Sequence, residues 1–207
     1  MLWYAEKEDK LKMTIFNTPI LSGIFHFLAL FMMRLLGWRV DGKLPDLPKF
    51  ILIGAPHTSN WDFVLFLGVI FTLKANVRFM GKVEVFRPPF GWFFRYCGGV
   101  PVDRSKSTGL VEQMVKASKE SEHFILTIAP EGTRHQVSEW KHGFYHIAKG
   151  AGLPIVIAIV DGKHKTVRVG QIFQSTENME ADLKMIKGFF EGITGINARR
   201  RYITLES

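Results

Sequence analysis

Cysteine is almost absent from this chain of 207 residues, which contains only Cys97. One cysteine cannot form an intrachain disulfide, and it excludes a zinc site built from cysteines. The sequence also has no HExxH motif, no internal repeat and no low-complexity tract. The sequence therefore shows no recognisable spacing of metal ligands. The near absence of cysteine fits a protein of a reducing compartment.

Long hydrophobic runs are scarce as well. Residues 19–33 (PILSGIFHFLALFMM) form a nearly continuous apolar run, which Arg34 ends. The run is shorter than the roughly 20 residues of a spanning helix, and it lacks the early basic flank and cleavage site of a secretory signal. We therefore expect residues 1–40 to be an N-terminal helical membrane-association segment, with either an interfacial helix at the membrane surface or a re-entrant helix that dips into the bilayer. The alternative is a helix buried in the protein core.

Acidic residues are outnumbered, with 19 Asp and Glu against 27 Lys and Arg and a formal net charge of +8. This balance favours partners that carry phosphate, namely anionic membranes, phosphorylated metabolites or nucleic acid, and does not choose among them. Basic residues on both sides of the apolar run are expected to contact lipid headgroups. They are Lys7, Lys10, Lys12, Arg34 and Arg39.

The hydrophobic content, 47% with 18 Phe and 5 Trp, predicts one well-cored domain. Short apolar runs predict buried strands, and a basic, β-branched run predicts a more exposed one; helical stretches separate them. The strands are expected at 50–54, 124–128, 155–160 and 165–169, and the helices at 61–74, 108–121, 143–150 and 177–191. The pattern indicates an α/β fold, a single domain with a mixed, largely buried sheet flanked by helices. This catalytic domain is placed at 41–207, beginning with a linker at 41–49.

A histidine and an aspartate five residues apart, His57 and Asp62, follow the first expected strand. If a helix begins just before Asp62, the corner between loop and helix lets the carboxylate meet an imidazole nitrogen. The carboxylate would then fix the tautomer of His57, which could act as a general base. The alternative is that His57 caps a strand end and Asp62 complements the helix dipole.

A second polar cluster, 130–134 (PEGTR), follows the strand at 124–128. Gly132 lets the backbone approach a ligand closely, and Arg134 can bind phosphate oxygens through two hydrogen bonds. Arg104 follows a glycine pair and a short strand, and is another phosphate candidate. Exposed ion pairs in turns are the alternative for both arginines. Because ligands of open α/β sheets bind beyond strand ends, we expect one site built from these loops.

In this order, the clusters resemble the glycerolipid acyltransferase family, which includes the 1-acylglycerol-3-phosphate acyltransferases. The resemblance runs from about residue 50 to residue 160 and rests on four ordered blocks. Pro56 stands where many members have Asn, and Ala129 where many have Phe. Residues 81–84 and 89–92 are also similar to the stretch between the family's first two blocks. The four blocks are matched, in order, by His57 and Asp62; by Gly99 and Arg104; by Pro130, Glu131, Gly132, Thr133 and Arg134; and by Leu153, Pro154 and Ile155.

The resemblance implies an O-acyltransferase of phospholipid biosynthesis. It would move a fatty acyl group from acyl-CoA or acyl carrier protein to the hydroxyl of a lysophospholipid, most simply 1-acylglycerol-3-phosphate, with no further cofactor and no metal. It implies work at a membrane surface, and we expect the cytoplasmic face of the inner (plasma) membrane and no nucleic-acid partner. His57 would be the general base and Asp62 would hold it, while the substrate would be bound by Lys82, Arg104, Glu131, Gly132, Thr133 and Arg134.

Three alternatives stay open at this point. The acceptor could be another lysolipid or a lipid-like alcohol. A hydrolase could hold a metal at His57, Asp62 and one of His135, His142 or His146, and a basic module that binds membranes or nucleic acid could use the run at 199–202.

The aromatic stretches at 63–71 and 90–94 could line an acyl groove, although core packing is the commoner use of such residues.

Overall fold

The computed structural model describes residues 14–102, 109–135, 137 and 139–197. Within these ranges, seven strands form one sheet in the order β1-β7-β6-β2-β5-β3-β4. Neighbouring strands are parallel, except for β6 and β7, which are antiparallel, so the expected mixed α/β sheet is confirmed. The strands are β1 (Arg39–Gly42), β2 (Lys49–Ala55), β3 (Arg78–Lys82), β4 (Gly99–Val102), β5 (Phe124–Ile128), β6 (Ile155–Asp161) and β7 (Thr166–Phe173).

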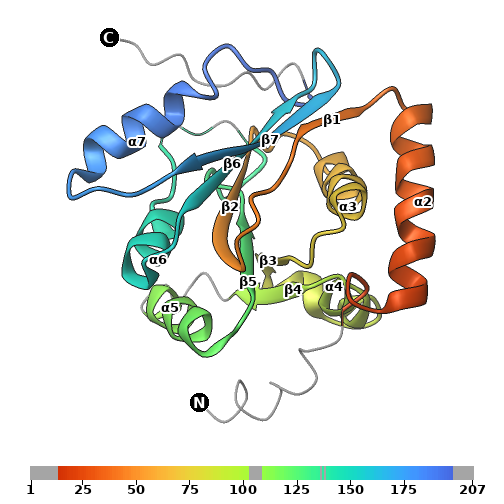
Figure 1. Ribbon diagram of the computed structural model, residues 1–207, viewed down its shortest axis with the longest axis horizontal. Helices are drawn as coiled ribbons and strands as arrows, with labels where there is room; N and C mark the ends of the chain where they lie inside the picture. The colour runs from red at the N-terminus through yellow and green to blue at the C-terminus, as the bar shows by residue number, and fades with distance from the viewer. Residues whose placement is uncertain (1–13, 103–108, 136, 138, 198–207) are drawn as a thin grey trace.

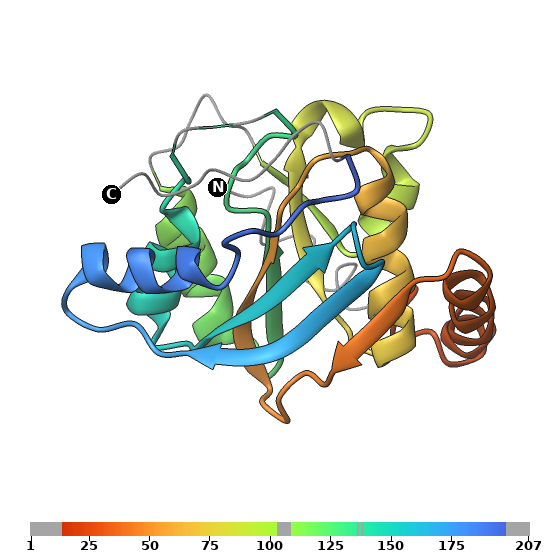
Figure 2. The ribbon, with the colours of Figure 1, turned by 90° about the horizontal axis from the view of Figure 1, so that it is seen from above.

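Helices cover both faces of the sheet, as Figures 1 and 2 show. Helix α3 (Trp61–Leu73) lies on one face, with α2 (Pro19–Leu35) outside it. The other face is covered by α5 (Leu110–Glu120), α6 (Gly143–Ala151) and α7 (Met179–Gly188). A short helix, α4 (Gly91–Tyr96), and the 3-10 turn η1 (Val83–Phe86) lie at the end of the sheet formed by β3 and β4.

Strand β2 shows why its sequence is a continuous apolar run. Ile51 and Ile53 point into the core beneath α5, α6 and α7, whereas Phe50 and Leu52 point into the core beneath α3. All four are at most 3% exposed. Successive side chains of a strand alternate between faces, so a central strand covered on both sides is apolar throughout.

The strands expected at 50–54, 124–128 and 155–160 are confirmed, as are the four helices, with ends that differ by a few residues. The fourth strand is longer than expected and continues to Phe173 as β7. The expected linker at 41–49 is partly wrong, because Asp41 and Gly42 belong to β1 and pair with β7. Strand β3 and helix α4 were not expected.

Helix α2 is half packed and half exposed. Its inner side rests on α3: Nδ1 of His26 donates to the Phe71 carbonyl at 2.8 Å, and Met33 lies over Gly68, which has no side chain to obstruct it. Its outer side exposes large apolar residues, so a helix wholly buried in the core is the wrong alternative. In the described ranges, no helix is long and apolar enough to cross a membrane. The exposed residues repeat at helical spacing and include Ile20, Ile24, Phe27, Phe31 and Leu35.

Strands β2 and β5 are adjacent and parallel, with Ile53 opposite Ile128. Their carboxyl ends therefore lie at the same edge of the sheet, and so do the loops that follow them. These are the loops that carry His57 and Glu131. The adjacency of β2 and β5 brings together two motifs more than seventy residues apart.

Candidate active site

His57 and Asp62 are in contact at the corner between β2 and α3. His57 Nδ1 lies 2.9 Å from Asp62 Oδ2, and their side chains are 24% and 9% exposed. Strand β2 ends at Ala55 and α3 begins at Trp61, so Asp62 lies in the first helical turn and faces back toward the loop. The expected contact across a loop-to-helix corner is confirmed.

Asp62 also holds the loop between the two elements. Its Oδ2 accepts hydrogen bonds from the backbone N–H groups of Thr58 and Ser59, both at 2.7 Å. Its Oδ1 is buried and has no hydrogen-bond partner within the described ranges. One carboxylate oxygen thus fixes both the backbone of the loop and the imidazole that the loop carries.

This arrangement selects the tautomer of His57. A carboxylate oxygen can only accept, so Nδ1 of the neutral imidazole carries the proton that it donates to Asp62. Nε2 is then the unprotonated nitrogen, on a ring that lines a cavity. A carboxylate at Nδ1 also stabilises the imidazolium that forms when Nε2 takes a proton. The pair therefore has the geometry of an oriented general base.

Glu131 connects the two motif loops. Its Oε1 accepts a hydrogen bond from the backbone N–H of His57 at 2.9 Å, a contact that the sequence analysis missed. The residue is 6% exposed; burial raises the pKa of its carboxyl, and the hydrogen bond from His57 lowers it in part. Glu131 is not among the residues that line the cavity. Its contacts support a role in positioning the His57 loop, and its contact with an acceptor stays a prediction.

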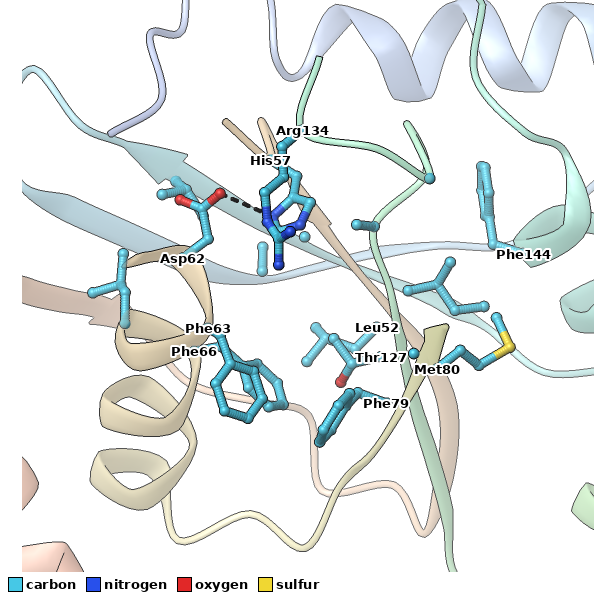
Figure 3. A pocket seen from close by; sticks show the side chains of 18 of the residues that line it. Leu52, His57, Asp62, Phe63, Phe66, Phe79, Met80, Thr127, Arg134 and Phe144 are labelled. Atoms are coloured by element: carbon cyan, nitrogen blue, oxygen red, sulfur yellow. Dashed lines mark ion pairs between the residues drawn. The ribbon is translucent and has the colours of Figure 1, made fainter. Parts of the chain in front are cut away.

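The cavity beside His57 has a volume of about 970 Å³. It is lined by several of the predicted binding residues, Lys82, Gly132, Thr133 and Arg134, as well as by His57 and Asp62. Figure 3 shows the side chains of His57 and Arg134 together at one end of it, with apolar side chains farther in. The structure therefore brings most of the predicted site into one cavity, whereas Arg104 lies outside the described residues.

Lys141 is a further cation of this cavity that the sequence analysis missed. Its backbone N–H donates to the Pro130 carbonyl at 2.8 Å, which folds the loop after β5 back on itself. Gly132 has a φ of +64°, and a Cβ there would lie 3.0 Å from the Lys141 Cδ. The lysine stem therefore covers the glycine turn, and Lys141 belongs to the same loop as Arg134.

Several backbone donors near the base are already used. The amides of His57, Thr58 and Ser59 donate to Glu131 and Asp62, and that of Gly132 donates to the Ala129 carbonyl at 3.0 Å. Because each of these amides already donates a hydrogen bond, none of the four is available to stabilise an oxyanion. The Thr133 hydroxyl accepts a hydrogen bond from the His135 amide at 3.3 Å, so its own hydrogen remains able to donate.

The aromatic stretches divide between cavity and core. Phe63, Phe66 and Phe79 line the cavity, and the ring of Phe79 makes edge contacts with Phe63 and Phe66 at centroid distances of 5.3 and 5.6 Å. Phe71 instead packs in the core at 6% exposure, and Phe90 is 67% exposed. Both uses that the sequence left open therefore occur, because some residues of the two stretches line the apolar cavity and others pack in the core or are exposed.

The rival sites are less well supported. In the parts of the chain that the structure describes, no three His, Cys, Asp or Glu side chains come together as a possible metal site. The hydrolase alternative therefore finds no ligand set there. The basic run at 199–202 lies outside the described residues.

Comparison with known proteins agrees with the motif order. Residues 39–160 match the sequence model of the Acyltransferase family. The chain is 31% identical over 132 residues to a 1-acyl-sn-glycerol-3-phosphate acyltransferase of Streptococcus pneumoniae, covering 59% of this chain and 48% of the relative. An enzyme of the same name from Haemophilus influenzae is 24% identical over 148 residues, covering 66% and 60%.

A solved structure shows the same fold. The chain matches the 1-acyl-sn-glycerophosphate acyltransferase PlsC of Thermotoga maritima with a TM-score of 0.62 and 19% sequence identity, covering 89% of this chain and 82% of that one. The chain spans about half the length of the curated relatives that it matches. The family match covers more than half of the chain, including both motif loops. The protein therefore belongs to the Acyltransferase family.

Proposed function

We propose that this protein transfers a fatty acyl group from an acyl thioester to the hydroxyl of a lysophospholipid, most simply 1-acylglycerol-3-phosphate. The observation that carries the proposal is the His57–Asp62 pair at 2.9 Å, at one end of an apolar cavity that also has basic residues. Relatives from several organisms are named for this reaction. His57 as a base matches the acceptor hydroxyl, the apolar part of the cavity matches the acyl chain, and the cations match the phosphate.

The mechanism starts with His57 Nε2 taking the proton of the acceptor hydroxyl. The hydroxyl oxygen then attacks the thioester carbonyl carbon, and the carbonyl electrons move to oxygen. When the tetrahedral intermediate collapses, the C–S bond breaks and the sulfur leaves with the proton held by His57. Asp62 stabilises the imidazolium between these steps, and general-base assistance of this kind contributes about 10²–10⁴ in rate.

The negative charge on the carbonyl oxygen needs a donor that is not already engaged. The Thr133 hydroxyl lines the cavity and can donate its hydrogen. Arg134 and Lys141 add positive charge on the same loop. Donors that point at developing charge before the reaction starts stabilise the transition state most effectively.

The cations of the cavity should bind the acceptor phosphate. We expect Arg134→Ala and Lys141→Ala each to raise KM for 1-acylglycerol-3-phosphate by about tenfold or more, because a hydrogen bond to a charged group contributes about 1.5–3 kcal/mol. Initial rates over a range of acceptor concentrations measure this. Lys184→Ala, in α7 and not among the residues that line the cavity, is the matched control and should leave KM unchanged. An unchanged KM in both cavity variants would contradict phosphate binding there.

The exposed face of α2 should place this cavity at a membrane. Its apolar outer residues repeat along the helix, and the neighbouring helices α3 and α4 expose Trp61 and Trp92 at 68% and 67%. Tryptophan is enriched at membrane interfaces, and an apolar helix face lies in the headgroup boundary. We propose attachment to the cytoplasmic face of the inner membrane, from which the acceptor is drawn.

The double substitution Phe27→Glu with Phe31→Glu tests this attachment. Burying each phenylalanine contributes about 1.5–3 kcal/mol, so we expect the fraction bound to anionic phospholipid vesicles to fall by about tenfold or more in a flotation assay. Met185→Glu replaces an equally exposed apolar residue on α7 and should bind as the unchanged protein does. Equal binding by all three proteins, with equal melting temperatures, would refute the role of α2.

The reaction itself is tested with a panel of acceptors. Purified protein is incubated with labelled acyl-CoA or labelled acyl carrier protein and with lysolipids that differ only in headgroup. We expect acyl transfer to the phosphate-bearing lysolipid to be fastest, with one thioester preferred. Transfer to every lysolipid at one rate would contradict the phosphate site, and no transfer from either thioester would contradict the proposed function.

A further inference from the structure

The cavity is lined on both faces of the sheet. Phe79 and Met80 are consecutive in β3, and Thr127 and Ile128 are consecutive in β5, yet all four line it. Consecutive side chains of a strand point to opposite faces. A groove confined to one face cannot be lined in this way, so the cavity continues around the carboxyl ends of β3 and β5.

Two lobes can therefore be defined. The α3 lobe lies between the sheet and α3, and the α6 lobe lies on the opposite face, next to α5 and α6. In Figure 3, Phe63, Phe66 and Phe79 lie on one side of β5, and Met80 and Phe144 lie on the other. The α3 lobe includes Leu52, Gly54, Phe63, Phe66 and Phe79, and the α6 lobe consists of Met80, Leu110, Val111, Ile128, Gly143 and Phe144.

The α6 lobe has room that the core does not fill. Met80, Leu110, Val111 and Ile128 pack against the core beneath α5 and α6, yet each is only partly buried. A Cβ added to Gly143 would meet no heavy atom within 4 Å. The whole cavity, at 970 Å³, is at the upper end of the range of about 300–1,000 Å³ for small-molecule sites. This volume suits more than one alkyl chain.

Positive charge enters the cavity from the elements that form the α6 lobe. Lys82 is two residues beyond Met80 in β3, so both side chains belong to the same face of the sheet. Lys141 is two residues before Gly143, the first residue of α6. The positions of Lys82 and Lys141 in the sequence favour a phosphate nearer to the α6 lobe than to the α3 lobe.

We propose that the α6 lobe binds the alkyl chain that the phosphorylated acceptor already carries, while the α3 lobe holds the chain being transferred. This inference rests on the proposed function. In a monoacyl glycerophosphate, a short glycerol joins the phosphate to the alkyl chain. The phosphate and the chain of the acceptor therefore bind on the same side of His57. The thioester chain comes from a separate molecule and takes the other face. The acceptor chain and the donor chain thus lie on opposite faces of the sheet, and their reacting groups meet at His57.

Two glycines provide a matched test, because each lines one lobe and each has open space at its Cβ position: Gly143 in the α6 lobe and Gly54 in the α3 lobe. We expect Gly143→Leu to lower kcat/KM for the longest acceptor by about tenfold relative to the shortest, the loss expected when roughly two methylene groups leave an apolar site. Its dependence on donor chain length should not change. Gly54→Leu should show the reverse pattern.

The assay varies acceptor and donor chain lengths independently, and Gly188→Leu in α7, also with open space, controls for the substitution itself. Gly143→Ala repeats the test with a smaller side chain, where we expect a weaker shift in the same direction. If the unchanged protein is active but neither Gly143 variant alters its acceptor chain dependence, the α6 lobe assignment is wrong. If the unchanged protein transfers nothing to any acceptor, the proposed function itself fails.

Discussion

Replacing His57 with alanine is expected to lower the rate of acyl transfer by about 10²–10⁴, because the base that we propose for the hydroxyl proton is lost. The protein should still fold, since the His57 side chain is 24% exposed and the loop is held through backbone groups. Single-turnover rates at saturating acceptor give the size of the loss. Thermal unfolding of the same preparation shows whether the fold is retained.

The chain contains a matched control for this substitution. His164 Nδ1 lies 2.8 Å from Asp161 Oδ2, at the turn between β6 and β7, so it forms the same kind of pair. Its side chain is 64% exposed and does not line the cavity. His164→Ala should therefore transfer acyl groups at the rate of the unchanged protein. A His57→Ala protein as active as His164→Ala would remove His57 from the mechanism.

Asp62→Asn is expected to have the next largest effect, a fall in kcat of about a hundredfold or more with a small change in KM. The amide oxygen can still accept the hydrogen bonds of Thr58 and Ser59, so the loop should keep its shape. The substitution removes the negative charge beside the imidazole, and in the proposed mechanism that charge acts in the transition state rather than in substrate binding. Steady-state kinetics separate the two parameters.

Asp161→Asn is the corresponding control, because it alters the His164 pair, which does not line the cavity, in the same chemical way. Its kcat should be unchanged. A rise in KM at constant kcat for Asp62→Asn would mean that Asp62 acts in binding and not on the base. Loss of the cooperative unfolding transition would show instead that its main role is to hold the loop.

The central strands could be predicted from the sequence because they are covered on both faces. Strands β2, β5 and β6 are short apolar runs bounded by turn residues, and β5 was predicted to the residue. Strand β1 was missed because its four residues are mostly exposed and polar, and only its pairing with β7 makes it a strand. The His57–Asp62 contact was predictable because it depends on local geometry alone.

Contacts between distant segments could not be predicted. The hydrogen bond from His57 to Glu131 requires β2 and β5 to be adjacent, and strand order is not readable from one sequence. Lys141 enters the cavity because its loop folds back to Pro130, and no spacing in the sequence signals that turn. Both features arise from tertiary structure, whereas the motifs themselves are local.

Acyl transfer at His57 is tested most directly by the products of one reaction. Purified protein is incubated with an acyl thioester labelled in its acyl chain and with 1-acylglycerol-3-phosphate, and the labelled lipids and free thiol are measured together. We expect equal amounts of thiol and labelled diacylglycerol phosphate from the unchanged protein, and about a hundredth of either or less from His57→Ala in the same time. Labelled free fatty acid as the only product, or equal transfer by His57→Ala, would contradict the account.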